Sequence, residues 1–524
     1  MLNTIPAPQQ FMAGEGTLTL DSSTQIMAEV GTESAAHWLR AGLARFAGIE
    51  VGAGIGVPIR LEIKPFEASL PETIGVRADG NLANHELHSI EITNKNATIT
   101  GVSAEAVFRG ATTLVQLAAL NNGVLPVGTI IDSPRIAWRG LSFDTVRCFH
   151  PVETVKNALD LLALYKLNVF HFHLTNTEGW RFQVDSWPML TEISGQTARN
   201  GRPGGYYTTE EFAEIVQYAD DRFIHVVPEF DTPGHTAAVI TAYPELANDE
   251  IRAMDPAMQY LHPDQPGVPE LMRDVYTAMA EQSNADYVHI GGDEAIGMDH
   301  ETFQRAIQLT LPIIRETGKK AVVWQEAARG GVTADELVQW WIPDEMIQRI
   351  KAALESGQGW GGHDPNDPKL RAFAELFAVA DQDVPLALDQ GASIILSSAK
   401  WLYLDTQYTE QSSDPGQNEQ HERLGMRPTV YANGTVQDSY NWDPVSVYPE
   451  VPVDRIAGVE AAIWCERIEN EDDLFFQLLP RLSGVAEKGW STPQEWEDYR
   501  NRLAAQPLFW DAMGLTWFKS SVVW

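Results

Sequence analysis

The sequence predicts an α/β protein in which a (β/α)₈ TIM barrel follows a small α+β domain. The chain has 524 residues, which is too long for one ordinary core and suits two domains. After about residue 134, eight short apolar runs recur, each followed by a polar loop and usually by a helical segment. Eight near-continuous apolar strands suit a closed parallel barrel covered by helices. The runs are residues 141–146, 168–174, 224–230, 287–292, 321–324, 337–341, 393–396 and 458–464.

We expect three parts along the chain: an α+β domain over 1–133, the barrel over 134–490 and a helical tail packed on the barrel over 491–524. The first part alternates strand-like and helical segments. Its expected strands and helices are 17–20, 59–63, 88–93 and 97–100, then 33–46 and 104–120. A doubly wound open sheet is the alternative fold for the second part, but no glycine-rich phosphate loop follows its first strand.

Four helices are expected between the barrel strands, over 152–165, 209–220, 270–281 and 302–317. The barrel pattern is also interrupted by a long insertion over 345–392. Loops of that length usually shape a site.

Charge and composition limit the class of partner. The chain has 37 Lys and Arg against 72 Asp and Glu, a net charge of −35. Such a surface repels nucleic acid phosphates and anionic membranes, so we expect neither as a partner. A neutral substrate is the natural inference, although the charge at a site can differ locally.

Cysteine usage and the first residues indicate the compartment. Cys148 and Cys465 are the only cysteines, which is too few for a disulfide framework and matches no standard metal spacing. The chain starts without a basic segment followed by an apolar core, so no secretory signal is recognised. We therefore expect a cytoplasmic protein with reduced thiols.

Chemistry is expected at the carboxyl ends of the barrel strands. The sharpest segment there is His289-Ile-Gly-Gly-Asp293-Glu294. Strand alternation places His289 and Asp293 on one side, and Glu294 follows where the chain turns over the barrel mouth. Two adjacent carboxyls in a low-dielectric site cannot ionise equally, so the pKa of one should rise, as protonation of a glycosidic oxygen requires. By itself, the string also suits an exposed Gly-Gly turn.

Aromatic residues strengthen the prediction of a sugar site. Tryptophan occurs 16 times, and aromatic faces stack on pyranose rings, although about half of these side chains are expected in the core. Trp464-Cys-Glu466 and Tyr403-Leu-Asp405 each place an aromatic ring and an acid on one face of an extended segment.

Histidines leave a metal-dependent hydrolase open as an alternative. His171-Phe-His173 ends an early strand, as in metal-dependent barrel hydrolases, and His225, His235 and His289 could complete a ligand set. No bridging lysine is apparent, and a hydrogen-bonded barrel histidine is the expected role of His171.

Five ordered segments together resemble glycoside hydrolase family 20, the β-N-acetylhexosaminidases. The resemblance spans about 135–490, and the first 133 residues resemble the small domain that usually precedes that barrel. The matching segments are Trp138-Arg-Gly-Leu-Ser-Phe-Asp144-Thr-Val-Arg147, Tyr165-Lys-Leu-Asn168-Val-Phe-His-Phe-His173-Leu, Gly179-Trp-Arg, Pro228-Glu-Phe-Asp231-Thr-Pro-Gly234-His235 and His289-Ile-Gly-Gly-Asp293-Glu294.

The resemblance implies a retaining exo-enzyme that removes terminal β-linked GlcNAc or GalNAc without a cofactor or metal. The substrate acetamido group would act as the nucleophile and form an oxazolinium intermediate, with Glu294 as general acid/base and Asp293 holding the acetamido group. Asp231 would orient Asp293, and His235 would support Glu294, with His173 and Asn176 nearby. The implied sugar contacts are Arg147, Trp324, Trp341, Tyr403, Asp405, Trp442, Trp464 and Glu466.

Three departures from the family pattern concern Asn176, Cys148 and Cys465. Asn176 stands where the family usually has Asp, so a relay to His235 and Glu294 would be weakened. Both thiols are expected near the site, most simply as buried filler. Two other functions stay open: a lacto-N-biosidase-like enzyme that releases a disaccharide, and a non-catalytic sugar-binding relative.

Overall fold

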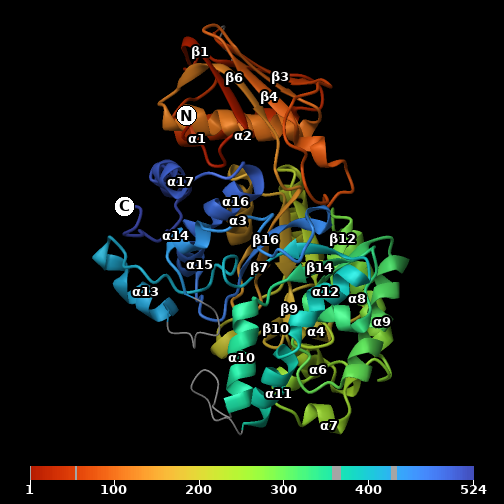
Figure 1. Ribbon diagram of the computed structural model, residues 1–524. Coiled ribbons are helices and arrows are strands. Elements are labelled where there is room, and N and C mark those ends of the chain that lie inside the picture. Colours follow the sequence, from red (N-terminus) through yellow and green to blue (C-terminus); the bar gives the residue numbers. More distant parts are fainter. Residues whose placement is uncertain (1, 53–55, 357–366, 426–432) are drawn as a thin grey trace.

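The computed structural model describes residues 2–52, 56–356, 367–425 and 433–524. A small domain sits on one end of a larger barrel, and α10 (Asp344–Ser356) and α11 (Pro368–Phe377) lie at the opposite end (Figure 1). The three parts expected from the sequence follow the same order along the chain: the last strand of the small domain ends at Asp132, and the first barrel strand begins at Trp138.

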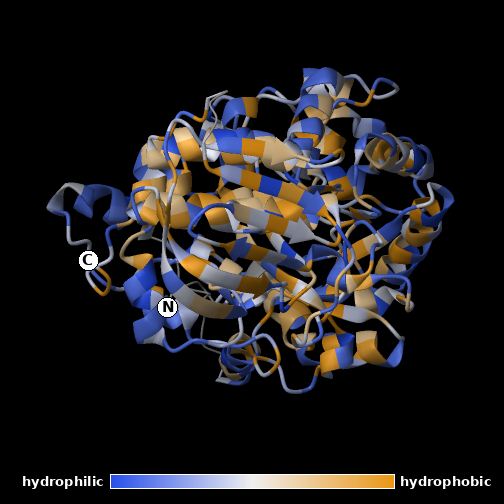
Figure 2. Ribbon diagram, turned by 90° about the horizontal axis from the view of Figure 1, so that it is seen from above, coloured by the Kyte–Doolittle hydropathy of each residue, from blue (hydrophilic) through white to orange (hydrophobic). Residues whose placement is uncertain are grey.

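The small domain is a six-stranded sheet with two helices packed together, α1 (Glu33–Ala47) and α2 (Ala104–Leu120). The strand order is β1-β6-β4-β5-β3-β2. Buried and more exposed residues alternate clearly along β4 and β5, and the sheet carries both hydrophilic and hydrophobic residues (Figure 2), as a sheet with one covered face requires. Two of its strands, β2 and β6, were not expected from the sequence. The strands are β1 Gln10–Thr19, β2 Gln25–Ala28, β3 Pro58–Ile63, β4 His88–Ile92, β5 Ala97–Gly101 and β6 Val124–Asp132.

The larger part is a closed barrel of eight parallel strands, which confirms the predicted (β/α)₈ fold. Each of the eight apolar runs contains or overlaps one of its strands. β7 and β16 pair with each other and close the barrel. The strands are β7 Trp138–Asp144, β8 Val169–His173, β11 His225–Glu229, β12 Tyr287–His289, β13 Lys320–Trp324, β14 Leu337–Trp340, β15 Ser393–Leu396 and β16 Ile456–Ile463.

Helices cover the barrel between its strands, and a short hairpin of β9 (Thr175–Asn176) and β10 (Gly179–Trp180) follows β8. The expected insertion over 345–392 contains α10, α11 and α12 (Asp383–Asp389), while its residues 357–366 lie outside the described part. The remaining helices are α3 Val152–Leu164, α4 Met189–Glu192, α5 Thr209–Asp220, α6 Ala237–Ala242, α7 Asp249–Arg252, α8 Val268–Gln282, α9 His300–Glu316, α13 Asn418–Gly425, α14 Val436–Tyr440, α15 Glu471–Leu478 and α16 Arg481–Trp490.

Local chemistry sets where these helices begin. At the start of α5, the Thr208 hydroxyl accepts a hydrogen bond from the Glu211 N–H, and the Glu211 carboxylate accepts one from the Thr208 N–H. This reciprocal cap satisfies two backbone donors that a helix start leaves free. Within the described residues, no helix combines the length and the apolar character needed to cross a membrane.

The C-terminal segment packs on the rest of the chain through α17 (Trp496–Leu503) and α18 (Pro507–Met513). The Trp510 indole N–H donates to the Tyr165 hydroxyl over 2.7 Å at the end of α3. Arg502 pairs with the buried Glu487 of α16 over 2.6 Å. These contacts fix the tail to helices of the barrel.

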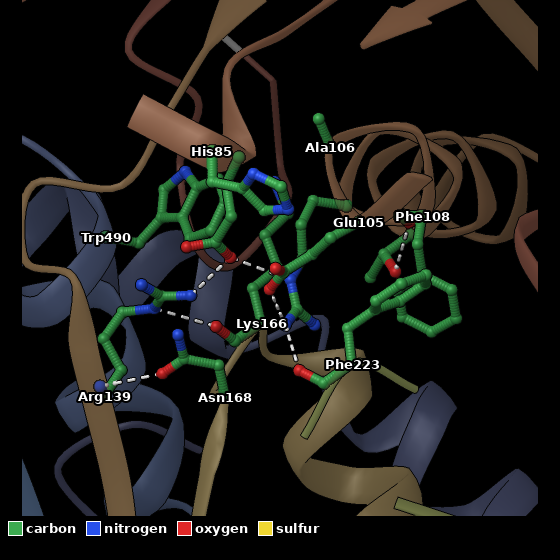
Figure 3. Close-up of polar contacts among 12 residues, drawn as sticks. His85, Glu105, Ala106, Phe108, Arg139, Lys166, Asn168, Phe223 and Trp490 are labelled. Atoms are coloured by element: carbon green, nitrogen blue, oxygen red, sulfur yellow. Dashed lines mark hydrogen bonds and ion pairs between the residues drawn. The ribbon is translucent and has the colours of Figure 1, made fainter. Parts of the chain in front are cut away.

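A buried charge cluster joins the small domain to the barrel (Figure 3). Its centre is Glu86, whose carboxylate accepts from Arg77 over 3.1 Å, from Arg109 over 2.9 Å and from Arg139 over 2.6 Å. Arg139 belongs to β7 and the other three residues to the small domain. Burial alone would raise the pKa of Glu86, but the three guanidinium groups hold it well below its ordinary value.

Replacing Glu86 with glutamine should destabilise the whole chain. Three buried guanidinium groups would lose their shared counter-charge, which typically costs about 3–5 kcal/mol. The measurement is the denaturant midpoint and melting temperature, with Glu62→Gln as the matched control. Glu62 pairs with Lys64, whose side chain is 57% exposed, so that variant should leave stability nearly unchanged. Equal effects of the two variants would contradict this role for Glu86.

Candidate active site

A cavity of about 500 Å³ opens at the carboxyl ends of the barrel strands. Both residues expected to be catalytic, Asp293 and Glu294, line it. The loops after β7, β8, β11, β12 and β16 all contribute to its wall. The lining residues are Arg147, His173, Asn176, Arg199, Asn200, Arg202, Asp231, His235, Asp293, Glu294, Trp341, Tyr403, Arg423, Trp464, Glu466, Arg467 and Glu469.

Two glycines after β12 allow the acidic residues to reach the cavity. Gly291 and Gly292 have φ values of +73° and +100°, which side-chain-bearing residues rarely adopt. A Cβ at position 291 would lie 1.9 Å from the Asp231 carboxylate. Glu294 itself has a φ of +43°, so the chain turns sharply where this side chain enters the cavity. The Gly-Gly pair is therefore required both for the turn and for close packing against Asp231.

Four side chains from the ends of β11 and β12 form an acidic group around one imidazole. His235 Nε2 lies 3.4 Å from Glu294 Oε2 and 3.7 Å from Asp293 Oδ2. Asp231 is 1% exposed, and one of its carboxyl oxygens lies within 4.8 Å of His235 and of the Asp293 carboxyl. The arrangement matches the expected supporting positions of Asp231 and His235.

The ionisation of this group is uneven. Burial and then the negative charge of Asp293 raise the pKa of Asp231 well above its ordinary value. Burial would also raise the pKa of Asp293, but its hydrogen bond and ion pair with His235 lower it instead. Burial would lower the pKa of His235, yet Asp231 and the two other acids raise it well above 6.5. These directions favour the neutral form of Asp231 and the charged forms of Asp293 and His235, so the raised carboxyl pKa belongs to Asp231 rather than to Asp293.

Three aromatic side chains form the opposite wall. The rings of Trp341 and Tyr403 lie parallel within 5°, with centroids 6.1 Å apart, and Trp464 meets Tyr403 at 67°. Trp341 is fixed from behind, because its indole N–H donates to Glu326 over 3.0 Å. Burial and then Asp293 raise the pKa of Glu326 well above its ordinary value. A concave aromatic surface of this kind suits the apolar face of a sugar ring.

Arg147 is held rigidly at one edge of the cavity. Its guanidinium lies 3.3 Å from Asp144, 3.4 Å from Glu178 and 5.2 Å from the centre of the Trp464 ring. Burial alone would lower the pKa of Arg147, but the charges of Asp144 and Glu178 raise it. Asp144 also accepts hydrogen bonds from the backbone N–H groups of Val146 and Cys465, over 2.7 and 2.9 Å, and so links the ends of β7 and β16.

A buried histidine network supports the site from inside the barrel. Both nitrogens of His171 face carboxylates, with Glu460 at 2.8 Å and Glu229 at 3.0 Å. Burial would lower its pKa, but these two acids raise the pKa of His171 to about 9. Glu229 also accepts from the Trp324 indole N–H over 3.0 Å and pairs with His173. His171 is thus the hydrogen-bonded barrel histidine expected from the sequence.

Asn176 acts on a different histidine from the one expected. Its side-chain oxygen accepts from the Thr177 N–H over 2.7 Å, so its amide nitrogen faces His173 Nε2 at 3.0 Å. That nitrogen of His173 must therefore accept a hydrogen bond, which leaves the other to donate to Glu229. The described hydrogen bonds of Asn176 therefore reach His173 and Thr177 and not His235.

The two cysteines are buried and unpaired. The Cys465 thiol lies 3.6 Å from His150 Nε2, and burial raises its pKa well above the ordinary value. Burial also raises the pKa of Cys148 to about 11. Both side chains are therefore thiols in the packed layer beneath Arg147 and Trp464, next to the residues that line the site.

Five of the eight predicted sugar contacts line the cavity, and three do not. Trp324 and Asp405 lie behind the lining: Trp324 is 1% exposed, and Asp405 accepts from the Trp464 N–H over 3.5 Å. Trp442 packs in the core instead, with its indole N–H donating to the Ser439 carbonyl over 3.0 Å, and is absent from the lining. The expectation that Trp442 contacts the sugar is therefore not supported. Trp442 follows α14 rather than a barrel strand, which the sequence pattern did not reveal.

Several wall residues were missed because they do not follow a strand directly. Arg199, Asn200 and Arg202 lie in the long connection between β8 and α5, and Arg423 lies on α13. Glu460 was missed for a different reason, since it stands inside the apolar β16. A lone acid in a fully buried strand is a usable signal, because it needs a polar partner in the barrel interior.

Among the described residues, three groups of His, Asp and Glu have ligand atoms within 4.8 Å of one another; the first two are buried and the third is partly buried. The groups are His171, Glu229 and His289; His173, Glu229 and Asp231; and Asp231, His235 and Asp293. A metal-dependent hydrolase would need the histidines named in the sequence analysis to meet at one metal centre. His225 instead lies at the other end of β11, 3.3 Å from Asp79. The first two groups are also tied to each other through Glu229, which serves as an acceptor for their imidazoles.

A barrel with a carboxyl pair at its rim and an aromatic wall around a polar cavity defines a carbohydrate-active hydrolase. Residues 136–360 and 371–493 match the glycosyl hydrolase family 20 catalytic domain, and residues 1–133 match domain 2 of that family. The chain belongs to glycosyl hydrolase family 20 and is a glycoside hydrolase of the β-N-acetylhexosaminidase type.

Individual relatives cover nearly the whole chain. A β-N-acetylhexosaminidase of Cellulomonas fimi is 32% identical over all of this chain and 95% of that protein. The family 20 β-N-acetylhexosaminidase of Streptomyces coelicolor A3(2) is 30% identical, covers 99% of this chain and 98% of that one, and superimposes with a TM-score of 0.80. The Streptomyces plicatus N-acetyl-β-hexosaminidase, solved with Thio-NAglucal, is 31% identical over 99% and 97%, with the same score of 0.80.

Proposed function

We propose that the protein is a retaining exo-β-N-acetylhexosaminidase that removes terminal β-linked GlcNAc or GalNAc with the help of the substrate's own acetamido group. The observation that supports this most is that Asp293, whose pKa is lowered by His235, and the neighbouring Glu294 line one aromatic-walled cavity. An aspartate-to-alanine variant of the Streptomyces plicatus enzyme was solved with its product GlcNAc, which is consistent with a sugar of this class.

In this mechanism the two acids have separate roles. Glu294 donates a proton to the leaving oxygen while the acetamido carbonyl oxygen attacks C1 from the opposite face, forming an oxazolinium ion. Asp293 accepts the acetamido N–H and stabilises the positive charge that develops there. Glu294 then takes a proton from water, which attacks C1 and restores the β configuration. Because the nucleophile is held within the substrate, the reaction gains the advantage of an intramolecular step.

The wall residues orient the ring. Tyr403 and Trp341 flank the acetamido side, Trp464 stacks under the ring, and Arg147, Asp405 and Glu466 take the outer hydroxyls. The mutual packing of these side chains makes the orientation rigid, so the acetamido oxygen is positioned before the leaving oxygen is protonated.

The test compares aryl β-glycosides of GlcNAc, GalNAc, glucose and lacto-N-biose. We expect release from the N-acetyl sugars with the β anomer formed first, and roughly 10³-fold slower release from glucose, which lacks the internal nucleophile. Equal rates on glucose would exclude acetamido participation. Preferred release of the disaccharide would indicate a lacto-N-biosidase, and binding without any release would indicate a non-catalytic relative.

A thiazoline analogue of the oxazolinium intermediate should be a strong competitive inhibitor. Intermediate-like analogues bind about 10²-fold or more tightly than substrates when a site is complementary to the charged species. The measurement is the inhibition constant against the aryl GlcNAc glycoside, with the oxygen-only sugar, glucose, as control ligand. A thiazoline that binds no better than glucose would contradict the mechanism.

A further inference from the structure

The wall of the cavity over β16, β7 and β8 is unusually basic for this chain. Acids outnumber Lys and Arg by 72 to 37 in the sequence, yet the lining holds five arginines. Barrel order places β16, β7 and β8 side by side, with β11 and β12 beyond them. Three of the five acids in the lining belong to the β11–β12 group, so Glu466 and Glu469 are the acids within the basic wall. The arginines are Arg147, Arg199, Arg202, Arg423 and Arg467.

Carboxylates neutralise three of these arginines. Arg147 and Arg199 share Glu178, and Arg147 also contacts Asp144. Arg423 lies 3.5 Å from Glu469 and also pairs with Asp473. These charges are thus largely committed to holding the loops of the wall together.

Arg202 differs from these three. Its guanidinium donates to the backbone carbonyl of Glu466 over 3.0 Å and to that of Ile468, which are neutral acceptors. In the described part of the chain, no carboxylate lies within ion-pair distance of Arg202. Because a guanidinium has five N–H donors, these two contacts and a further one with the Cys148 thiol leave donors, and a positive charge without a carboxylate partner, at the cavity wall. The side chain is also locked in place, since both carbonyls belong to the segment that follows β16.

The position of Arg202 relative to the sugar follows from the proposed function, on which this inference rests. The leaving oxygen lies at Glu294 over β12, and the outer hydroxyls lie at Arg147 and Glu466. Arg202, bonded to the Glu466 backbone, therefore borders the hydroxyl edge that is remote from the leaving group. An unsubstituted hydroxyl needs no unneutralised cation there, whereas an oxyanion does.

We propose that this basic wall accepts an anionic ester, a sulfate or a phosphate, on the outer hydroxyl edge of the terminal N-acetylhexosamine, and that Arg202 determines the specificity for it. Arginine presents a planar pair of N–H groups that matches two oxygens of a tetrahedral oxyanion, and such charge-assisted bonds are among the stronger ones in proteins. The wall would also offset the repulsion that a chain of net charge −35 exerts on an anionic substrate.

The experiment measures kcat/KM for four aryl β-glycosides of GlcNAc: the unsubstituted sugar, its 6-sulfate, its 4-sulfate and its 6-phosphate. In the wild-type enzyme we expect at least one ester to be cleaved as efficiently as the unsubstituted sugar. The ester with the highest kcat/KM shows whether the site recognises a sulfate or a phosphate. Esters that are all cleaved more than tenfold less efficiently than the unsubstituted sugar would overturn the inference while leaving the proposed function intact. If none of the four glycosides is cleaved, both proposals fail.

Variants then assign the role to Arg202. In Arg202→Gln, the ratio of kcat/KM for the ester to that for the unsubstituted sugar should fall about 10- to 100-fold. In Arg202→Lys, the same ratio should lie between those of the wild type and Arg202→Gln. Arg273→Gln is the matched control, because its side chain is 55% exposed on α8 and lies outside the cavity. That control should keep the wild-type ratio. If both substrates lose the same factor in Arg202→Gln, Arg202 only positions the backbone around Glu466, and the assignment is wrong.

Discussion

Replacing Glu294 with glutamine is expected to lower kcat/KM about 10³-fold on substrates with a poor leaving group, such as a sugar–sugar linkage. The amide cannot donate the proton that the departing alkoxide needs. An activated aryl leaving group departs without that proton, so the loss on such a substrate should be much smaller. The measurement is kcat/KM for a disaccharide of GlcNAc and for a series of aryl glycosides of rising leaving-group pKa.

The dependence on the leaving group is what identifies Glu294 as the acid. His235 lies 3.4 Å from its carboxylate, so a change at Glu294 also alters the charge around Asp293. A purely electrostatic effect of that kind would lower the rate by the same factor for every leaving group. Glu301→Gln, the same change in the first turn of α9, is the matched control and should leave all rates unaltered. A loss in Glu294→Gln that is equal across the series would contradict its role as the acid.

The fold was predictable because the barrel strands are short, buried and largely apolar, with only a few polar residues in each. The runs that became β8 and β11 carry this pattern, interrupted only by two histidines in the first and by a histidine and an acid in the second. Strands exposed on one face are harder to recognise. β6 contains Pro126 and Gly128 within its nine residues, and β2 has only four residues, none of them fully buried. Neither shows a clean alternation, which is why both were missed.

The site was predictable to the extent that its residues follow strands. Asp293, Glu294, Arg147 and Glu466 all stand just beyond strand ends, and the parallel barrel brings those ends together. Arg202 could not be placed from the sequence, because its position depends on a long connection whose path is set by tertiary contacts such as its bond to the Glu466 carbonyl. The same limitation explains Trp442, an aromatic residue near the site in sequence but not in space.

The layered arrangement beneath the cavity explains how a few rim residues are held so rigidly. Glu229 receives Trp324 and the imidazoles of His171 and His173, while Asp144 receives Arg147 and the backbone of Cys465. Glu229 and Asp144, which support the rim, are thus each bound by several buried partners, most of them from other parts of the chain. Preorganisation of this kind lets Asp293 remain charged in a buried position without moving when the substrate's charge develops.

Replacing Asp293 with asparagine should lower kcat about 10²- to 10³-fold, with the same factor for every leaving group. Asparagine keeps the shape and can still accept the acetamido N–H, but it removes the negative charge that stabilises the oxazolinium ion. The loss should therefore depend on the acetamido group: the advantage of GlcNAc over glucose substrates should shrink in the variant. Rates on both sugars are measured for the wild type, the variant and Asp286→Asn, an exposed aspartate just before the start of β12.

Removing the charge at position 293 also changes its neighbour, which makes the prediction sharper. The pKa of Asp231 is raised by burial and by Asp293, so it should fall towards its ordinary value once that charge is gone. Asp231 could then ionise and restore part of the negative charge beside His235. The rate of Asp293→Asn should therefore rise with pH as Asp231 loses its proton. The double variant Asp231→Asn, Asp293→Asn should lack this rise and should be slower than either single variant. If Asp293→Asn instead loses activity in proportion to leaving-group pKa, or cleaves GlcNAc and glucose substrates with the wild-type preference, then the carboxylate at 293 does not hold the acetamido group.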